Sequence, residues 1–231
     1  KYAALAFLSR VYLQQGNYAA ALAAADEVIQ RGLFKLNASV SAVFSNKNTA
    51  ESIWEVQQNE QNNAGTSNNG MATFYASLPG IGRADVRITA SFVSSNYPAG
   101  DLRRTEWYYI GTGARPGNTY CGKWKSFSQN LPIIRIAEMY LTRAECKLAL
   151  NDVTLPTPGE DLAQIKNSIR TNSVAPNNPT LGEVRNERLI ELAFEGQRIH
   201  NLKRLQQSTG SFLWNDNKLV FPIPQREIDA T

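Results

Sequence analysis

Apolar side chains recur every three to four residues near both ends of the chain, and this period predicts α-helices there. Residues 3–31 contain two such stretches separated by Gln15-Gly16-Asn17, which predicts a helical hairpin. A second hairpin is expected from a helix at 132–152 and a shorter one at about 160–171. A further helix is predicted at about 181–207, after a segment rich in proline and asparagine.

The first hairpin resembles a tetratricopeptide repeat. The packing positions of that repeat are filled here by Leu8, Tyr12, Gly16, Tyr18 and Ala21. A single repeat cannot bury both of its faces, so we expect other helices to pack against it.

The helical period disappears between about residues 34 and 131, where Gly, Asn, Ser and Thr become frequent. Short β-prone pieces occur at 52–56 and 107–110. Trp54 alternates with apolar neighbours in the first of them, which predicts a buried strand residue. A long irregular segment inside a compact domain is uncommon unless it is functional, so this insertion is the candidate ligand region.

These patterns predict a mainly α fold, in which tetratricopeptide-like helical hairpins carry a long irregular insertion that contains short β pieces. We expect a single domain over residues 1–231. Its parts are the hairpin at 1–33, the loop-rich insertion at 34–131 and a helical C-terminal part at 132–231.

The formal net charge of +4 comes from 24 basic and 20 acidic residues mixed along the chain. No run of Lys and Arg makes a phosphate-binding stripe, so we expect no nucleic-acid partner. No stretch approaches the roughly 18 uninterrupted apolar residues of a membrane span. The helical period already runs at the first residues and no signal-peptide pattern precedes it, so we expect a fragment whose membrane anchor lies outside it.

The sequence lacks the side-chain patterns that usually indicate a metal or cofactor site. Cys121, Cys146 and His200 show no close spacing typical of a zinc site. The glycine pairs at 80–82 and 111–113 lack the third glycine of a nucleotide-binding turn. We therefore expect no metal and no cofactor, and the pairing of the two cysteines stays open.

Three segments of the C-terminal half are similar to the SusD/RagB family of outer-membrane nutrient-binding lipoproteins. The most specific is ERLIELAFEGQR at 187–198, which continues to Leu202-Lys203-Arg204 and is close to the family's ERxxELAFEGxR…DLxR signature. It departs at Asn201, where the family usually has Asp. The others are RIAEMYLTRAE at 135–145 and PIPQREI at 222–228.

This resemblance implies a helical fold with tetratricopeptide-like hairpins and non-catalytic binding of a glycan, or in some relatives of a peptide or other nutrient. It also implies a surface-exposed lipoprotein of the outer membrane that delivers its ligand to a SusC-like TonB-dependent transporter. Contact with the membrane would come only through a lipid anchor outside residues 1–231.

Glu187, Glu191 and Glu195 stand four apart on one predicted helix, and two carboxylates are the machinery of a glycosidase. Neighbours on a single helix do not face each other across a substrate, however, and Glu195 with Arg198 has the spacing of an ion pair. We therefore expect a structural network of charges, in which Arg198 supports stability, and no catalytic residues.

Aromatic side chains in the insertion are the candidate ligand contacts, because a half-exposed ring can stack on the C–H face of a sugar. Trp107 and Tyr108 are adjacent in a β-prone piece, so they point to opposite faces and only one need face solvent. Tyr75 and Trp124 lie near polar, flexible chain. The predicted ligand-binding residues are therefore Trp107, Tyr108, Tyr75 and Trp124.

The sequence thus favours a glycan-binding protein that is not an enzyme. The main alternative is a tetratricopeptide-type adaptor that binds a protein or peptide on its helices. A glycoside hydrolase is a third hypothesis, although neither a nucleophile motif nor a carboxylate pair on two different elements is visible.

Overall fold

The predicted first hairpin is present and consists of α1 (Tyr2–Gln14) and α2 (Tyr18–Arg31). The computed structural model describes residues 1–68 and 70–229. Gly16 turns the chain with a positive φ of 73°, and the Asn17 side chain caps α2 by accepting a hydrogen bond from the Ala20 amide. Buried alanines of α2 leave little side chain between the helices, so that the two backbones approach closely.

The long helix α7 (Ile136–Leu150) lies at the centre of the helical body, against α2, α8 (Pro158–Ile165) and α9 (Leu181–Glu191). It is surrounded on nearly all sides, which explains why it buries charged residues together with apolar ones. Both α8 and α9 begin with a capping box, at Thr157 and Thr180. The second predicted hairpin is present, although its first helix begins at Ile136 because 131–135 form a strand. Its second helix covers Pro158–Ile165 and does not extend to residue 171.

The single helix predicted at 181–207 is wrong, because the chain forms two helices there, α9 and α10 (Arg198–Arg204). Phe194 and Gly196 between them have positive φ values of 63° and 79°. The break frees backbone carbonyls for other partners. The carbonyl of Ala193 accepts from Lys123 Nζ at 3.0 Å, and that of Phe194 accepts from Trp124 Nε1 at 3.0 Å.

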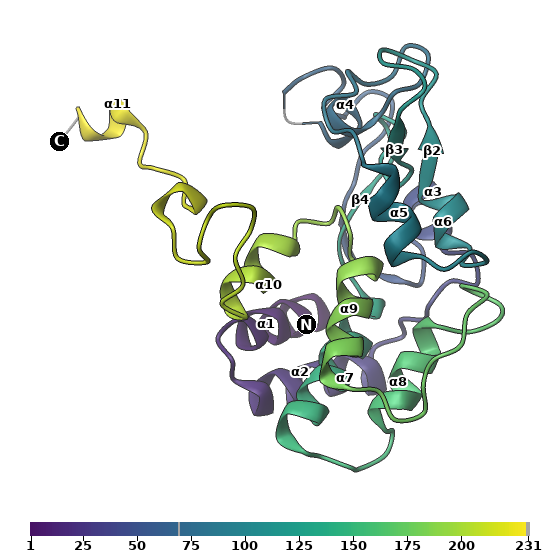
Figure 1. Cartoon of the computed structure of the whole chain (residues 1–231), viewed down its shortest axis with the longest axis vertical. Coiled ribbons are helices and arrows are strands. Elements are labelled where there is room, and N and C mark those ends of the chain that lie inside the picture. The colour runs from purple at the N-terminus through teal and green to yellow at the C-terminus, as the bar shows by residue number, and fades with distance from the viewer. Residues whose placement is uncertain (69, 230–231) are drawn as a thin grey trace.

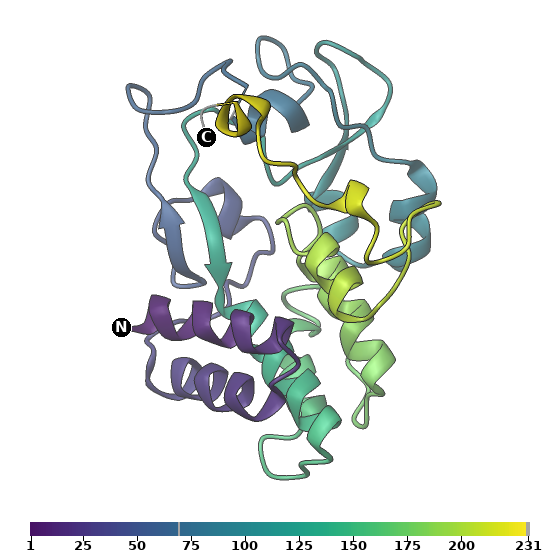
Figure 2. The ribbon, with the colours of Figure 1, turned by 90° about the vertical axis from the view of Figure 1, so that its left-hand side faces the viewer.

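The insertion lies at one end of the molecule, beyond the helical body (Figures 1 and 2). As predicted, it is mostly irregular chain that contains short β pieces, and it also holds short helices that the sequence did not predict. These elements are α3 (Ala42–Ser45), β1 (Ser52–Val56), α4 (Met71–Tyr75), α5 (Ala90–Asn96), α6 (Arg103–Glu106), β2 (Tyr108–Ile110) and β3 (Thr119–Cys121).

Two antiparallel strand pairs organise the insertion, β1 with β4 (Leu131–Arg135) and β2 with β3. Burial alternates along β1, where Ile53 and Glu55 face inward. Trp54 faces the other way and is 46% exposed, with its edge against Phe7 of α1. The prediction that Trp54 is buried is therefore wrong, since the polar Glu55 rather than Trp54 takes the inward position.

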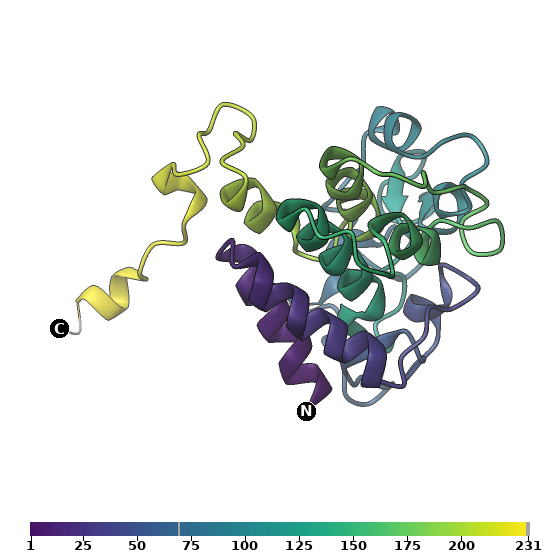
Figure 3. The ribbon, with the colours of Figure 1, turned by 90° about the horizontal axis from the view of Figure 1, so that it is seen from below.

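The last segment, with η1 (Asn217–Leu219) and α11 (Gln225–Ile228), extends away from the body (Figures 1 and 3). Phe221 within it is 99% exposed. Cys121 and Cys146 are both buried free thiols. Among the helices that the structure describes, none has the length and apolar character to cross a membrane.

Candidate functional site

A groove of about 800 Å³ opens between the α9–α10 segment and the insertion. One side is formed by α9, the turn after it and α10. The other is formed by Tyr75 at the end of α4, residues 87–89 and Phe92 of α5. Its size falls within the range of small-molecule and oligosaccharide sites.

Three aromatic rings form an apolar part of the groove. Phe194 lies between Tyr75 and Phe92, with ring centroids 6.0 Å from each and edge-to-face geometry. Tyr75 is half-buried, and burial raises the pKa of its phenol. The hydroxyl is protonated at neutral pH, as an ordinary phenol is, and within the described residues no hydrogen bond engages it.

The remaining lining combines aliphatic side chains with amide and guanidinium groups. Amides come from Asn186, Gln197, Asn201 and Gln207. Guanidinium groups come from Arg87, Arg185, Arg188, Arg198 and Arg204. A wall of this kind offers many hydrogen-bond donors to the hydroxyl or anionic oxygens of a ligand. The aromatic rings of the groove can contact an apolar face of the same ligand.

Glu145 of α7 lies fully buried behind this wall. It contacts Arg185 and Arg204 at 2.8 Å and Arg188 at 3.2 Å. Burial alone would raise the pKa of Glu145, but the three guanidinium groups outweigh it and lower that pKa to about 2. The carboxylate thus fixes the orientation of α9 and α10 against the central helix.

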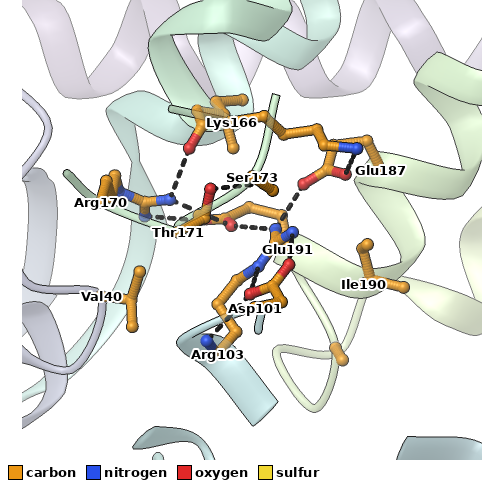
Figure 4. Close-up of polar contacts among 12 residues, drawn as sticks. Val40, Asp101, Arg103, Lys166, Arg170, Thr171, Ser173, Glu187, Ile190 and Glu191 are labelled. Atoms are coloured by element: carbon orange, nitrogen blue, oxygen red, sulfur yellow. Dashed lines mark hydrogen bonds and ion pairs between the residues drawn. The ribbon is translucent and has the colours of Figure 1, made fainter. Parts of the chain in front are cut away.

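A second buried network holds α9 against the insertion (Figure 4). Glu191 of α9 accepts hydrogen bonds from Arg103 at 2.9 Å, Arg170 at 2.7 Å and Arg135 at 3.2 Å. These arginines hold the pKa of Glu191 well below its usual range, against the opposing effect of burial. Arg103 also pairs with Asp101 at 2.7 Å and with Glu187.

The expected ion pair between Glu195 and Arg198 is wrong. Glu195 contacts Lys123 at 2.7 Å and Arg135 at 2.9 Å instead, because the turn between α9 and α10 directs its side chain inward. Arg198 is exposed on the groove, and no ion pair or hydrogen bond engages its side chain among the described residues. The expectation of a structural network holds for Glu187, Glu191 and Glu195 but does not include Arg198.

Three of the four predicted ligand-binding residues lie in the core, with Trp107, Tyr108 and Trp124 at 0%, 5% and 2% exposure. Their polar atoms are used internally. Trp107 Nε1 donates to the Val40 carbonyl at 2.8 Å, and the Tyr108 hydroxyl lies 2.8 Å from that of Tyr97. The expectation of an exposed ring is wrong for these three, because the insertion folds around an aromatic core of its own.

Tyr75 is the predicted site residue that lines the groove. Phe92 and Phe194 also line the groove but were not among the predicted ligand contacts, and Arg198 was expected in a structural ion pair. Gly196 inside the predicted helix was the available signal, since a glycine there favours a break that turns neighbouring side chains outward.

The fold and the groove together define a helical, tetratricopeptide-like protein with a ligand-sized depression at the edge of its insertion. The SusD family model matches residues 94–221, more than half of the chain, and the chain therefore belongs to the SusD family.

Solved structures support the same fold. A laminarin-binding SusD-like protein has 20% identity and a TM-score of 0.79, with 100% of this chain and 60% of that chain covered. Surface glycan-binding protein A from Bacteroides uniformis has 18% identity and a TM-score of 0.79, covering 99% of this chain and 58% of that one.

Surface glycan-binding protein A from Bacteroides thetaiotaomicron, in complex with laminarihexaose, has 18% identity and a TM-score of 0.77. The match covers 96% of this chain and 60% of that chain. The chain thus spans about three fifths of the length of these relatives. Among curated proteins, none matches it.

Proposed function

We propose that the chain is the ligand-binding part of a cell-surface protein that captures a glycan without converting it. The observation that carries the proposal is the groove, where the half-buried Tyr75 ring lies opposite a wall of amide and guanidinium donors. Rings bind the C–H face of a sugar, and the donors bind its hydroxyls. Relatives with the same fold that are named for laminarin or glycan binding support this reading.

The affinity is expected to be modest, in the micromolar to millimolar range. The groove offers only a few ring contacts, and its hydrogen bonds compete with water at an open surface. These gains must offset the lost translational and conformational freedom of the oligosaccharide, so a Kd of roughly 1 μM to 1 mM is expected.

Capture without conversion is supported by the state of the carboxylates. Glycoside hydrolysis needs one protonated acid and one ionised partner on opposite sides of the bond. Glu191 and Glu195 are both held ionised by basic partners, since their pKa values are lowered despite burial. Neither lines the groove, so neither can reach a bound sugar.

The protein partner in this proposal is a SusC-like TonB-dependent transporter of the outer membrane, which receives the glycan. The location is the outer face of that membrane, with a lipid anchor outside residues 1–231. Membership of the SusD family supports both statements. Co-purification of the transporter with the anchored protein from solubilised membranes tests the pairing, and a transporter that never co-purifies contradicts it.

A tetratricopeptide-type adaptor is the second candidate function. Leu8 and Val11 of α1 are 42% and 47% exposed, so the outer face of the hairpin retains apolar surface of the kind that binds a peptide or a further helix. This face lies on α1 and is separate from the groove.

Affinity electrophoresis in gels that contain single polysaccharides distinguishes the two candidates. Glycan binding predicts retardation in at least one polysaccharide gel and none in a gel without polysaccharide. The Leu8→Ser and Val11→Ser variants should be retarded to the same extent as wild type. No retardation across neutral and acidic polysaccharides, together with capture of a peptide that these two variants lose, would favour the adaptor.

A further inference from the structure

We propose that the groove selects acidic glycans, whose sugar carboxylate or sulfate groups are bound by Arg87 and Arg198. This inference rests on the proposed glycan-binding function and names the chemical class of the ligand. It follows from the charges that line the groove and from the partners that those charges have or lack.

The lining is strongly asymmetric in charge. Five arginines contribute to it, while the described residues that line it include neither Asp nor Glu. The whole chain carries 24 basic and 20 acidic residues, so an acid-free lining with five guanidinium groups is a local feature rather than a reflection of composition.

Three of the five arginines are only partly neutralised. Arg185, Arg188 and Arg204 share the single carboxylate of Glu145, which leaves two positive charges in excess in this group. Burial lowers the pKa of Arg188, and the neighbouring Arg204 adds to this effect against the opposing Glu145 and Glu138. Positive potential thus remains at the wall of the groove.

The other two, Arg87 and Arg198, are exposed and have no ion-pair partner among the described residues. Nearby carboxylates are engaged elsewhere. Asp85 pairs with Arg83 at 2.7 Å, and Glu183 accepts a hydrogen bond from the Thr180 amide at 2.7 Å in its capping box. Arg87 and Arg198 are therefore the guanidinium groups available to a ligand.

The two arginines belong to opposite sides of the groove. Arg87 precedes Ile88 and Thr89 on the insertion side, and Arg198 is the first residue of α10 on the other. A guanidinium group binds a carboxylate or sulfate through two parallel N–H···O bonds, which gives affinity and orientation. An acidic oligosaccharide can meet both arginines while one of its rings packs against Tyr75.

A matched pair of ligands tests the inference by calorimetry. Trigalacturonate and its methyl ester share one backbone and differ in charge, and laminarihexaose serves as a neutral glycan. We expect trigalacturonate to bind about tenfold more tightly than its methyl ester. Raising the salt concentration from about 50 mM to about 500 mM should strongly weaken the binding of the charged ligand and change that of the neutral ligands little.

Single and double variants assign the effect to the two side chains. Arg87→Gln and Arg198→Gln should each weaken trigalacturonate binding by about fivefold to tenfold, and the double variant should bind acid and ester alike. Arg115→Gln is the matched control, since Arg115 is exposed and lies outside the groove. It should bind like wild type.

The outcomes separate this inference from the function on which it rests. Equal affinity for acid and ester, or binding of laminarihexaose alone, overturns the acidic selectivity while glycan capture stands. If polyglutamate binds at least about tenfold more tightly than trigalacturonate, the groove takes protein carboxylates and the inference is wrong. If neither acidic nor neutral glycans bind, both proposals fail.

Discussion

Tyr75 and Phe194 meet edge to face with ring centroids 6.0 Å apart, although they are separated by more than a hundred residues in the chain. Phe194 lies in the break between α9 and α10 and has a positive φ of 63°. The groove therefore depends on that break, and the break in turn depends on the buried charges that hold α9 against the insertion.

Glu191→Gln is expected to destabilise the protein by about 3 to 5 kcal/mol, because it leaves three buried guanidinium groups without their shared carboxylate. Unfolding in guanidinium chloride, followed by far-UV circular dichroism, measures the change in free energy of unfolding. Glu106→Gln is the control, since Glu106 is exposed and outside this network. If both variants unfold at the same denaturant concentration as wild type, the network does not stabilise the fold.

Arg188→Ala and Arg198→Ala should behave differently although the two residues lie only ten positions apart. Arg188 is buried against Glu145, so its loss is expected to cost about 3 kcal/mol. Arg198 is exposed and unpaired among the described residues, so its loss should change stability by less than about 0.5 kcal/mol. Thermal melting of both variants checks this, and a large loss for Arg198→Ala would restore the structural role expected from sequence.

The stability that Glu145 provides should depend on pH in a defined direction. The folded-state pKa is lowered to about 2 from the ordinary value of 4.5, so the ionised carboxylate favours folding above pH 4.5. That contribution, about 3 kcal/mol, is lost as the pH falls from 4.5 toward 2. In urea unfolding, the difference in free energy of unfolding between wild type and Glu145→Gln should therefore become smaller as the pH falls over this window. A difference in free energy of unfolding that stays constant from neutral pH to pH 2 would contradict the ion pairing of Glu145 with its arginines.

Trp107→Phe should affect stability rather than ligand binding. Trp107 is fully buried, its Nε1 donates to the Val40 carbonyl, and Lys123 Nζ lies 3.8 Å from its ring centroid. Loss of the hydrogen bond and weakening of the cation–π contact should cost about 1 to 3 kcal/mol. Unfolding curves and a glycan titration on the same sample separate the two effects, and weakened binding at unchanged stability would place Trp107 in the site.

The sequence was sufficient for the helical hairpin, the central helix and the family, because these depend on local periodicity and on contiguous motifs. It was insufficient for the break at 192–197, because the stretch from Leu189 to Ala193 keeps a helical apolar pattern. Gly196 favours a break locally, and hydrogen bonds from Lys123 and Trp124 to the carbonyls of Glu191 and Phe194 stabilise the non-helical conformation of this segment.

The candidate site was predictable only in part. Tyr75 was identified, but ring exposure depends on which aromatic residues meet in the core, and those contacts join distant segments. Trp107, for example, packs edge to face on Phe44, more than sixty residues away. The arginines of the groove lie at position 87, on α9 and on α10. Tertiary packing brings them together, and no local sequence pattern predicts it.

The most direct test of the central claim is a calorimetric titration of wild type, Tyr75→Phe and Tyr75→Ala with a glycan that retards the wild-type protein in affinity gels. Groove binding predicts that Tyr75→Ala weakens affinity by about 1 to 3 kcal/mol, that Tyr75→Phe retains most of it, and that the glycan is recovered intact. All three proteins should melt at similar temperatures, because Tyr75 is only half-buried. Equal affinity of the folded Tyr75→Ala variant and wild type, or release of new reducing ends from the glycan, would contradict capture of a glycan in this groove.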